Sequence, residues 1–267
     1  MRRVLVLGYI VSVLGCNNSN NGNSEGTSTR PPEPEAMNGV IQKSYPHDTS
    51  SFTEGLLIYN GSLYESTGNY GHSKLRKLNL SSGKVEQEVK LDSNYFGEGI
   101  AILRDTVYQL TYKTRVAFVY TLKDFKKVKQ VSFSTESGEG WGMTTDGTYL
   151  IATDGTSNIY YYDPASFKVV KKITVIDAGT LSYNVNELEY FDGYLYANQW
   201  QLPYILKIDP SSGQVVAKID LTDVLNGIKQ KDPNADVLNG IAYDAATKKI
   251  YVTGKWWPEL YEVQFTK

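Results

Sequence analysis

The sequence predicts an all-β fold for most of its 267 residues, and three observations support this. Tyrosine, which favours strands, occurs 21 times. Short apolar runs are separated by dipeptides that favour tight turns, such as Asn60-Gly61, Asp146-Gly147 and Asp192-Gly193. From Val40 onward, no long segment repeats its apolar residues with the period of a helix.

The composition narrows the class of function. The chain has 27 Lys and Arg residues against 29 Asp and Glu residues. This near-neutral balance argues against nucleic acid as a partner, because phosphate binding needs concentrated positive charge. One cysteine excludes an internal disulfide, and two histidines far apart do not favour a histidine-built zinc site.

Residues 1–15 have the composition of a signal peptide, with two arginines followed by an apolar run from Val4 to Leu14 that is too short to span a membrane. The stretch Val13-Leu14-Gly15-Cys16 resembles a bacterial lipobox, in which the cysteine is lipidated and becomes the mature N-terminus. An ordinary secretory signal with a chance cysteine is the alternative. We expect an exported bacterial lipoprotein of the cell envelope, anchored by several acyl chains at Cys16 because a single chain binds membranes only weakly.

Residues 16–38 are rich in Asn, Gly, Ser, Thr, Pro and Glu and contain almost nothing apolar. Such a segment cannot offset its ordering entropy by burial. We therefore expect the lipidated Cys16 to be followed by a disordered tether up to residue 38, and residues 39–267 to form one folded domain.

Five segments of the chain can be aligned with one another. Each begins with an acid or an amide and continues into a strand, and their first residues are 41 to 53 positions apart. This is the period of a four-stranded propeller blade, and further strand-like runs within each complete unit bring its total to four. The segments run from Glu54 to Tyr64, Glu98 to Tyr108, Glu139 to Leu150, Asn186 to Tyr196 and Asn239 to Tyr251.

The fifth unit contains only three strand-like runs before the chain ends at Lys267. Val40 to Tyr45 resembles the outer strands of the other units, and its pairing beside Leu260–Phe265 would leave no bare edge. The sequence therefore predicts a five-bladed β-propeller whose last blade is closed by an N-terminal strand. An eight-stranded sandwich and a linear solenoid are the alternatives, although a solenoid does not need a strand that completes its last repeat.

The first strand of each propeller blade lines the central axis, so equivalent positions of the repeats converge at one mouth of the channel. Here they hold Glu54, Glu98, Glu139, Asn186 and Asn239. Burial and neighbouring like charges raise the proton affinity of a carboxylate, which suits it to general acid/base catalysis. The alternative is that these side chains accept backbone N–H groups at blade junctions, and a structural role fits Glu139 and Asn239 best.

Aromatic residues lie beside the same positions, and Lys255 follows an inner strand as the only cation expected at this mouth. Such a rim suits a small ligand with apolar and amide groups, because tryptophan N–H groups can act as donors. Propellers also pack aromatic residues between blades, and we expect this of at least one of Trp256 and Trp257. The aromatic residues are Phe52, Phe96, Tyr112, Trp141, Trp200, Trp256 and Trp257.

Seven motifs together, spread from about Tyr45 to Phe265, resemble the plant-and-bacterial type of glutaminyl-peptide cyclotransferase (glutaminyl cyclase). The resemblance implies a five-bladed propeller that converts N-terminal glutaminyl residues of peptides into pyroglutamate and releases ammonia, with no metal and no cofactor. The motifs are Phe52-Thr53-Glu54-Gly55-Leu56, Phe96-Gly97-Glu98-Gly99, Glu139-Gly140-Trp141-Gly142, Asn186-Glu187-Leu188-Glu189, Asn198-Gln199-Trp200, Leu238-Asn239-Gly240-Ile241-Ala242 and Gly254-Lys255-Trp256-Trp257-Pro258.

The resemblance also implies roles for individual residues. Glu98 corresponds to the proposed acid/base, and Tyr112 stands where the family often has tryptophan, which leaves the pocket shape and the substrate preference open there. The partners implied are peptides or proteins with an N-terminal glutamine, and we expect a monomer that meets the membrane only through its lipid. The substrate-binding positions are Phe52, Glu54, Phe96, Tyr112, Trp141, Asn186, Trp200 and Lys255.

Two other functions remain open. A propeller lipoprotein could bind a small ligand or a peptide N-terminus without turnover. A metal-dependent propeller hydrolase is the second alternative.

Overall fold

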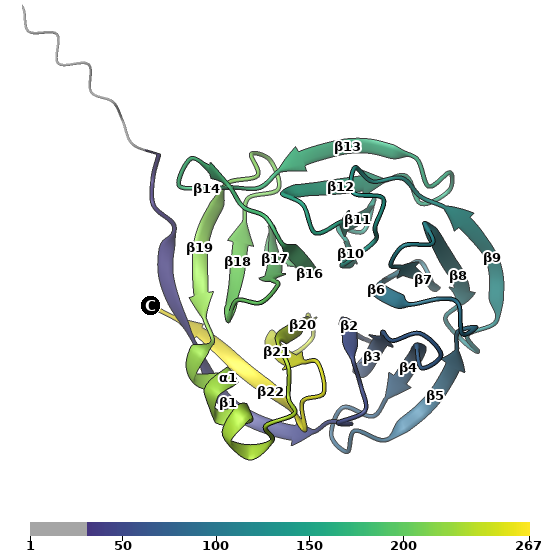
Figure 1. Ribbon diagram of the computed structural model, residues 1–267, viewed down its shortest axis with the longest axis horizontal. Coiled ribbons are helices and arrows are strands. Elements are labelled where there is room, and N and C mark those ends of the chain that lie inside the picture. The colour runs from purple at the N-terminus through teal and green to yellow at the C-terminus, as the bar shows by residue number, and fades with distance from the viewer. Residues whose placement is uncertain (1–30) are drawn as a thin grey trace, which may run out of the picture. The chain divides into compact units, whose positions relative to one another are not determined.

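The computed structural model describes residues 31–267, which contain 22 β-strands and one α-helix (Figure 1). The predicted all-β class is confirmed. The predicted signal peptide, the lipidation at Cys16 and most of the predicted tether lie outside the described residues. Between residues 31 and 267, no helix has the length and apolarity needed to cross a bilayer.

Most strands belong to antiparallel sheets that are arranged around a common centre (Figure 1). Three of these sheets have four strands each, in chain order from the centre outward. The first contains β2 (Thr53–Tyr59), β3 (Ser62–Thr67), β4 (Lys74–Leu78) and β5 (Val85–Lys90). The second contains β6 (Gly97–Leu103), β7 (Thr106–Thr111), β8 (Val116–Thr121) and β9 (Lys127–Ser132). The third contains β10 (Met143–Thr145), β11 (Leu150–Thr153), β12 (Asn158–Tyr162) and β13 (Val169–Thr174), and is followed by the hairpin β14 (Ile176–Asp177) and β15 (Thr180–Leu181).

The remaining strands form an eight-stranded sheet with the order β16-β17-β18-β19-β1-β22-β21-β20. A strand from the N-terminal part of the chain, β1, therefore lies between two C-terminal ones (Figure 1). The bounds are β1 (Glu35–Pro46), β16 (Val185–Phe191), β17 (Tyr194–Gln199), β18 (Tyr204–Ile208), β19 (Val215–Asp220), β20 (Leu238–Asp244), β21 (Lys249–Gly254) and β22 (Glu259–Thr266).

The pairing of β1 with β22 is antiparallel, with Val40 opposite Gln264 and Tyr45 opposite Leu260. The predicted pairing of the N-terminal strand with the last strand is thus confirmed. The predicted tether is wrong at its end, because residues 35–38 already belong to β1 and pair in parallel with β19. Composition alone missed this, since the strand is held there chiefly by backbone hydrogen bonds, with one apolar contact from Met37 to the core.

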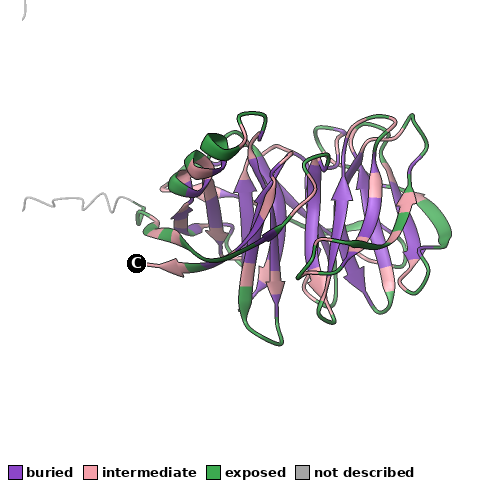
Figure 2. Ribbon diagram, turned by 90° about the horizontal axis from the view of Figure 1, so that it is seen from below, coloured by how far each residue is buried: buried purple, intermediate pink, exposed green. Residues whose placement is uncertain are grey.

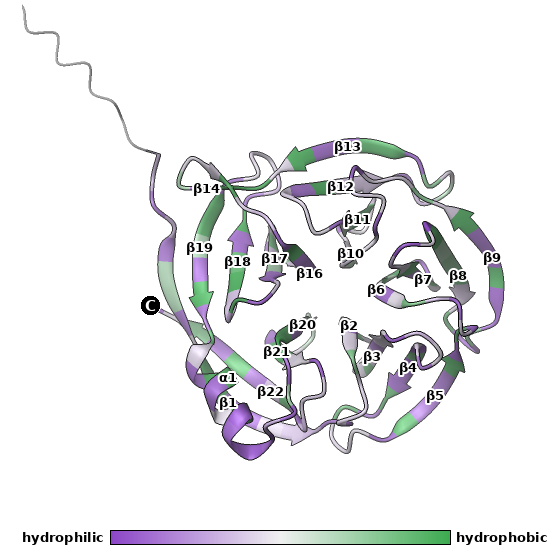
Figure 3. Ribbon diagram, viewed as in Figure 1, coloured by the Kyte–Doolittle hydropathy of each residue, from purple (hydrophilic) through white to green (hydrophobic). Residues whose placement is uncertain are grey.

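Apolar side chains fill the space between neighbouring sheets. Leu57 of the first sheet packs with Ile100 and Phe118 of the second in one buried cluster. Figure 2 shows buried strands in the interior with exposure concentrated at the loops and outer strands, and Figure 3 shows mixed hydropathy along outer strands such as β9. The core is therefore a set of interfaces between sheets, which leaves the centre of the ring for other groups.

Helix α1 (Thr222–Lys231) lies between β19 and β20 and accounts for the longest repeat separation. Val224 and Ile228, one helical turn apart, are buried in the same cluster as Trp257. Trp257 is fully buried there, which confirms that at least one of the two adjacent tryptophans serves the core.

The innermost strands approach one another closely at glycine. A Cβ at Gly99 of β6 would lie 2.2 Å from the backbone nitrogen of Met143 in β10, and one at Gly55 of β2 would lie 2.8 Å from that of Ile100 in β6. At the position of β16 that corresponds to Gly55 and Gly99, the chain carries Glu187 instead of glycine. Its carboxylate accepts hydrogen bonds from the backbone N–H groups of Leu56 in β2 (3.2 Å) and Ile241 in β20 (2.8 Å).

Candidate active site

All nine site residues predicted from the sequence line one cavity of about 280 Å³. They come together because inner strands begin, and second strands end, at the same end of each antiparallel sheet. Glu54, Glu98 and Asn186 lie near the starts of inner strands, and Tyr112, Trp200 and Lys255 follow the ends of second strands. The residues lining the cavity are Phe52, Glu54, Phe96, Glu98, Tyr112, Trp141, Asn186, Trp200, Asp236 and Lys255.

Glu54 and Lys255 form a buried ion pair, with Nζ 2.7 Å from Oε1 and side-chain exposures of 3% and 7%. The other oxygen of Glu54 accepts a hydrogen bond from the Asn239 amide (3.0 Å), which also donates to the Thr53 carbonyl (2.9 Å). Burial raises the pKa of Glu54, and the Lys255 charge and the hydrogen bonds that Lys255 and Asn239 donate to Glu54 oppose that rise. The pair thus places a compensated charge in the wall of the cavity.

Glu98 has a different environment. It is 5% exposed, and its carboxyl group has no hydrogen-bond partner among residues 31–267. Burial raises the pKa of Glu98 well above its usual range, the Glu54 and Glu139 charges add to the rise, and the Lys255 charge opposes it. Two neighbouring carboxyl groups thus differ in their partners, which is the arrangement that separates acid/base roles in active sites.

The walls of the cavity are aromatic. Trp141 and Trp200 meet edge to face with ring centroids 5.7 Å apart. Phe96 lies 6.0 Å from Phe52 and 5.6 Å from Tyr112, centroid to centroid. Such walls exclude water and strengthen electrostatic interactions at the two carboxyl groups.

The donors in these walls are not equivalent. The Trp141 indole already donates to Glu139 Oε2 (3.0 Å). Within residues 31–267, neither the Trp200 indole nor the Asn186 side-chain amide donates a hydrogen bond. Trp200 and Asn186 therefore keep their donors free for a ligand.

Glu139 and Asn239, for which a structural role was the better interpretation, do not line the cavity and instead hold residues that do. Trp256 is also outside the lining and packs on Phe52 at a centroid distance of 4.9 Å. Lys255 is the single cation among the described residues that line the cavity, as expected, and Lys113 lies outside this lining. Lys113 lies 4.7 Å from the Tyr112 ring centroid and 3.5 Å from the Glu139 carboxylate.

Asp236 is the one lining residue that the sequence did not predict. Its backbone N–H donates to the Lys255 carbonyl (2.8 Å), and its carbonyl accepts the Trp257 indole N–H (2.9 Å). It precedes the first aligned position of the fifth repeat, Asn239, so the repeat alignment gave no signal for it.

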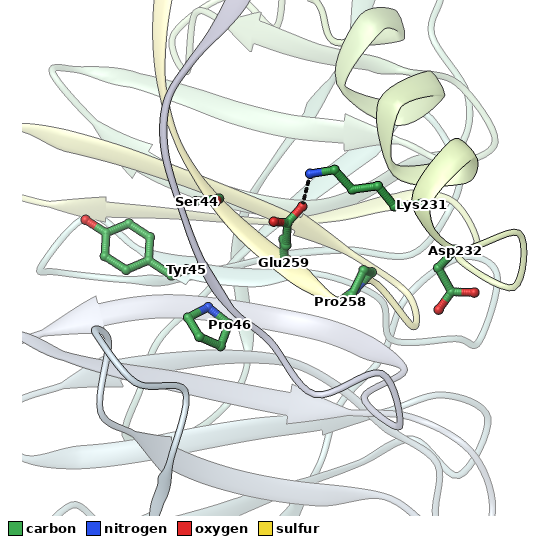
Figure 4. Close-up of a pocket in the computed structure, with 7 residues that line it drawn as sticks. All are labelled: Ser44, Tyr45, Pro46, Lys231, Asp232, Pro258 and Glu259. Atoms are coloured by element: carbon green, nitrogen blue, oxygen red, sulfur yellow. Dashed lines mark hydrogen bonds and ion pairs between the residues drawn. The ribbon is translucent and has the colours of Figure 1, made fainter.

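A second cavity, of about 540 Å³, lies where β1 and the turn before β22 pass the end of α1 (Figure 4). Lys231 points across it to Glu259, with which it forms an ion pair. No predicted site residue lines it. In residues 31–267, no group of three or more His, Cys, Asp and Glu side chains is placed to share a metal ion.

The ring of β-sheets brings two unlike buried carboxyl groups, a lysine and free donors into one aromatic cavity. Such a site is suited to acid–base chemistry on a small polar group. Comparison with known proteins is more specific. Residues 10–265 match the glutamine cyclotransferase family, and the chain belongs to that family.

Two relatives agree with this assignment. A glutaminyl-peptide cyclotransferase of Arabidopsis thaliana is 41% identical over 226 residues, which cover 84% of this chain and 70% of the relative. The crystal structure of the Myxococcus xanthus glutaminyl cyclase superimposes with a TM-score of 0.81 at 33% identity, covering 88% of this chain and 99% of the other. The family resemblance stated from the motifs is thereby confirmed.

Proposed function

We propose that this protein is a glutaminyl-peptide cyclotransferase that converts N-terminal glutamine of peptides and proteins into pyroglutamate and releases ammonia. Family membership and the names of both relatives support this activity. The observation that carries it is the unpartnered, buried Glu98 in a cavity with free amide and indole donors.

Glu98 is the general acid/base in this proposal. The substrate's α-amine must lose a proton before it attacks the γ-carboxamide carbon, and the departing amine must gain one as its bond to that carbon breaks. One carboxyl group within reach of both nitrogens can perform both transfers, and its raised pKa brings the two protonation states closer in energy near neutral pH. Attacking and leaving groups belong to one molecule, so the cavity need only hold the folded-back side chain.

The amide oxygen gains negative charge as the tetrahedral adduct forms. Trp200, Asn186 and Lys255 are the donors proposed to stabilise it, because the first two have no other acceptor in the described part of the chain. Glu54 holds Lys255 in place and compensates its charge. Phe52, Phe96, Tyr112 and Trp141 supply the apolar walls.

The finer architecture proposed is a five-bladed β-propeller. The three four-stranded sheets supply three blades, and the eight-stranded sheet supplies two more, joined where β19 meets β1. The inner strands β2, β6, β10, β16 and β20 then surround the axis, as their places in Figure 1 suggest. We further propose a monomeric, exported lipoprotein anchored through Cys16, a hypothesis that rests on the lipobox-like sequence.

The test is release of ammonia from a glutamine-initiated peptide, together with a fall in peptide mass equal to one ammonia. Glu98→Gln should lower kcat by about 10²- to 10⁴-fold. Glu86→Gln, a change on outer strand β5, is the matched control and should leave kcat unchanged. A protein that binds the peptide without releasing ammonia, or an undiminished Glu98→Gln variant, would contradict the proposal.

The proposed reaction uses no metal, and a strong chelator tests this separately. Activity retained after prolonged chelation supports acid/base catalysis by side chains. Activity that is lost and then restored by one added divalent ion would favour the metal-dependent alternative.

A further inference from the structure

Glu65 of β3 is completely buried behind one wall of the cavity. Its carboxylate is surrounded by polar groups of the segment that precedes and begins β2. Oε1 lies 3.0 Å from His47 Nε2 and accepts a hydrogen bond from the Thr53 hydroxyl (2.8 Å), and Oε2 accepts one from the Ser51 hydroxyl (3.0 Å). The proposed reaction uses none of these residues.

The same segment supplies two residues of the cavity. Successive side chains of an extended chain point to opposite sides. Ser51 and Thr53 therefore face Glu65, and Phe52 and Glu54 face the cavity. The hydrogen bonds to Glu65 thus fix the side of the segment that faces away from the substrate.

A second connection leads from the same group to Lys255. His47 Nδ1 lies 2.7 Å from the Trp257 carbonyl oxygen, and the His47 backbone N–H donates to the Pro258 carbonyl (3.0 Å). The Trp256 N–H donates to the Ser51 carbonyl (2.7 Å). Trp256 has a φ of 61°, an uncommon conformation that neighbouring contacts must hold. These bonds hold the turn that follows β21 and carries Lys255.

Both ring nitrogens of His47 therefore face acceptors, a carboxylate and a carbonyl. Each can be satisfied only by an N–H, which requires the doubly protonated imidazolium. Burial lowers the pKa of His47, but the Glu65 charge, the bonds to Glu65 and Trp257 and the Asp48 charge raise it above its ordinary value. Arg76 forms a longer ion pair with Glu65 (3.9 Å) and also contacts Asp48 (2.9 Å) and the Ser51 hydroxyl (3.0 Å). Glu88 pairs with Arg76 in turn.

We infer that protonated His47 and Glu65 form a buried positioning pair, which holds the Lys255 turn and the Phe52–Glu54 segment in their catalytic arrangement. This inference rests on the proposed function. Neither residue lines the cavity, so both act through the residues they hold. As pH rises through the pKa of His47, one ring nitrogen loses its proton and one of the two bonds is lost. The turn then loosens, and kcat/KM falls on the alkaline side.

The direct test is an NMR titration of protein labelled with ¹³C at histidine. The sequence has only two histidines, and His72→Asn assigns both signals. The expected result is that His47 keeps its imidazolium shift well above pH 6.5, the ordinary pKa of histidine. A His47 signal that is neutral at or below that pH would overturn the inference. The measurement needs neither turnover nor a variant of His47, so it is independent of the proposed function.

The kinetic test is the pH profile of Glu65→Gln, which keeps the size of the side chain and an oxygen for Thr53. Removing an opposite charge 3.0 Å from the imidazole should move both the His47 titration and the alkaline limb of kcat/KM to lower pH by about one unit or more. Asp244→Asn, at the far end of β20, is the matched control. Its carboxyl is also buried but bonds to the Ala246 backbone N–H (3.0 Å) and the Thr247 hydroxyl (2.7 Å), away from the cavity, and its alkaline limb should coincide with that of the wild type.

An alkaline limb of Glu65→Gln that coincides with the wild type, while the His47 titration moves, would overturn the positioning role. A wild-type protein without turnover would instead contradict the proposed function and leave the histidine titration to be judged by itself.

Discussion

Replacing Lys255 by methionine tests whether the buried ion pair controls the ionisation of Glu54. The substitution removes the ammonium group and keeps most of the side chain's volume. With Nζ 2.7 Å from the Glu54 carboxylate, the Coulomb attraction is about 6 kcal/mol at an effective dielectric constant of about 20. No other cation among residues 31–267 forms an ion pair with Glu54. Without Lys255, burial should keep its carboxyl group protonated.

The cost of that protonation can be calculated from the pH. In the unfolded chain Glu54 has its ordinary pKa of 4.5, and in the folded variant burial should raise the pKa with no lysine charge to oppose it. Folding then takes up a proton, so stability falls as pH rises above 4.5, by about 1.4 kcal/mol per unit. The penalty is therefore at most about 1.4 kcal/mol at pH 5.5 and about 3.4 kcal/mol at pH 7.

Urea unfolding of the wild type and Lys255→Met at these two pH values measures the difference in the free energy of unfolding. The penalty of the variant should grow by up to about 2 kcal/mol between pH 5.5 and pH 7. Adding Glu54→Gln to the variant should abolish that growth, because no carboxyl group then takes up the proton. A penalty that is the same at both pH values, or larger at pH 5.5, would refute the reasoning.

Two further predictions concern the neighbouring carboxyl group and the packing of the inner strands. Glu54→Gln removes a negative charge that raises the pKa of Glu98, so the acid limb of kcat/KM should move to lower pH, and a limb that stays or moves upward would contradict this. Gly99→Ala places a methyl group 2.2 Å from the Met143 backbone and should lower the free energy of unfolding by about 1–3 kcal/mol or more. The control is Gly227→Ala in α1, where the added methyl group meets open space. It should raise the free energy of unfolding by about 0.5–1 kcal/mol. Equal effects of the two substitutions in urea unfolding would argue against the close approach of β6 and β10.

The cavity could be predicted because its residues occupy repeated positions. Glu54, Glu98 and Asn186 share one place in the first, second and fourth units, and a closed ring brings such places together whatever their distance in sequence. The closing strand could be predicted for a related reason, since a unit with three strands needs a fourth. Repetition therefore carried both inferences.

Features that belong to a single unit could not be predicted in this way. Asp236 precedes the repeated part of its unit, and Lys113 is an ordinary surface lysine until the fold places it beside Tyr112. His47 meets the Trp257 carbonyl across 210 positions of sequence, and a backbone acceptor has no signature in the residue that carries it. The start of β1 is likewise fixed by backbone pairing, to which Met37 alone adds apolar packing between residues 35 and 38.

The carboxylate of Glu187 explains how a ring of similar units can hold different side chains at fixed positions around its centre. This one side chain bonds to Leu56 of β2 and to Ile241 of β20. Leu56 lies two positions after Glu54, and Ile241 lies two positions after Asn239, the hydrogen-bond partner of Glu54. Glu187 itself directly follows Asn186. Sliding of either strand along the axis would break a bond to this single group. Glu187 thus fixes the positions of Glu54, Asn239 and Asn186 along the axis relative to one another, although it does not line the cavity itself.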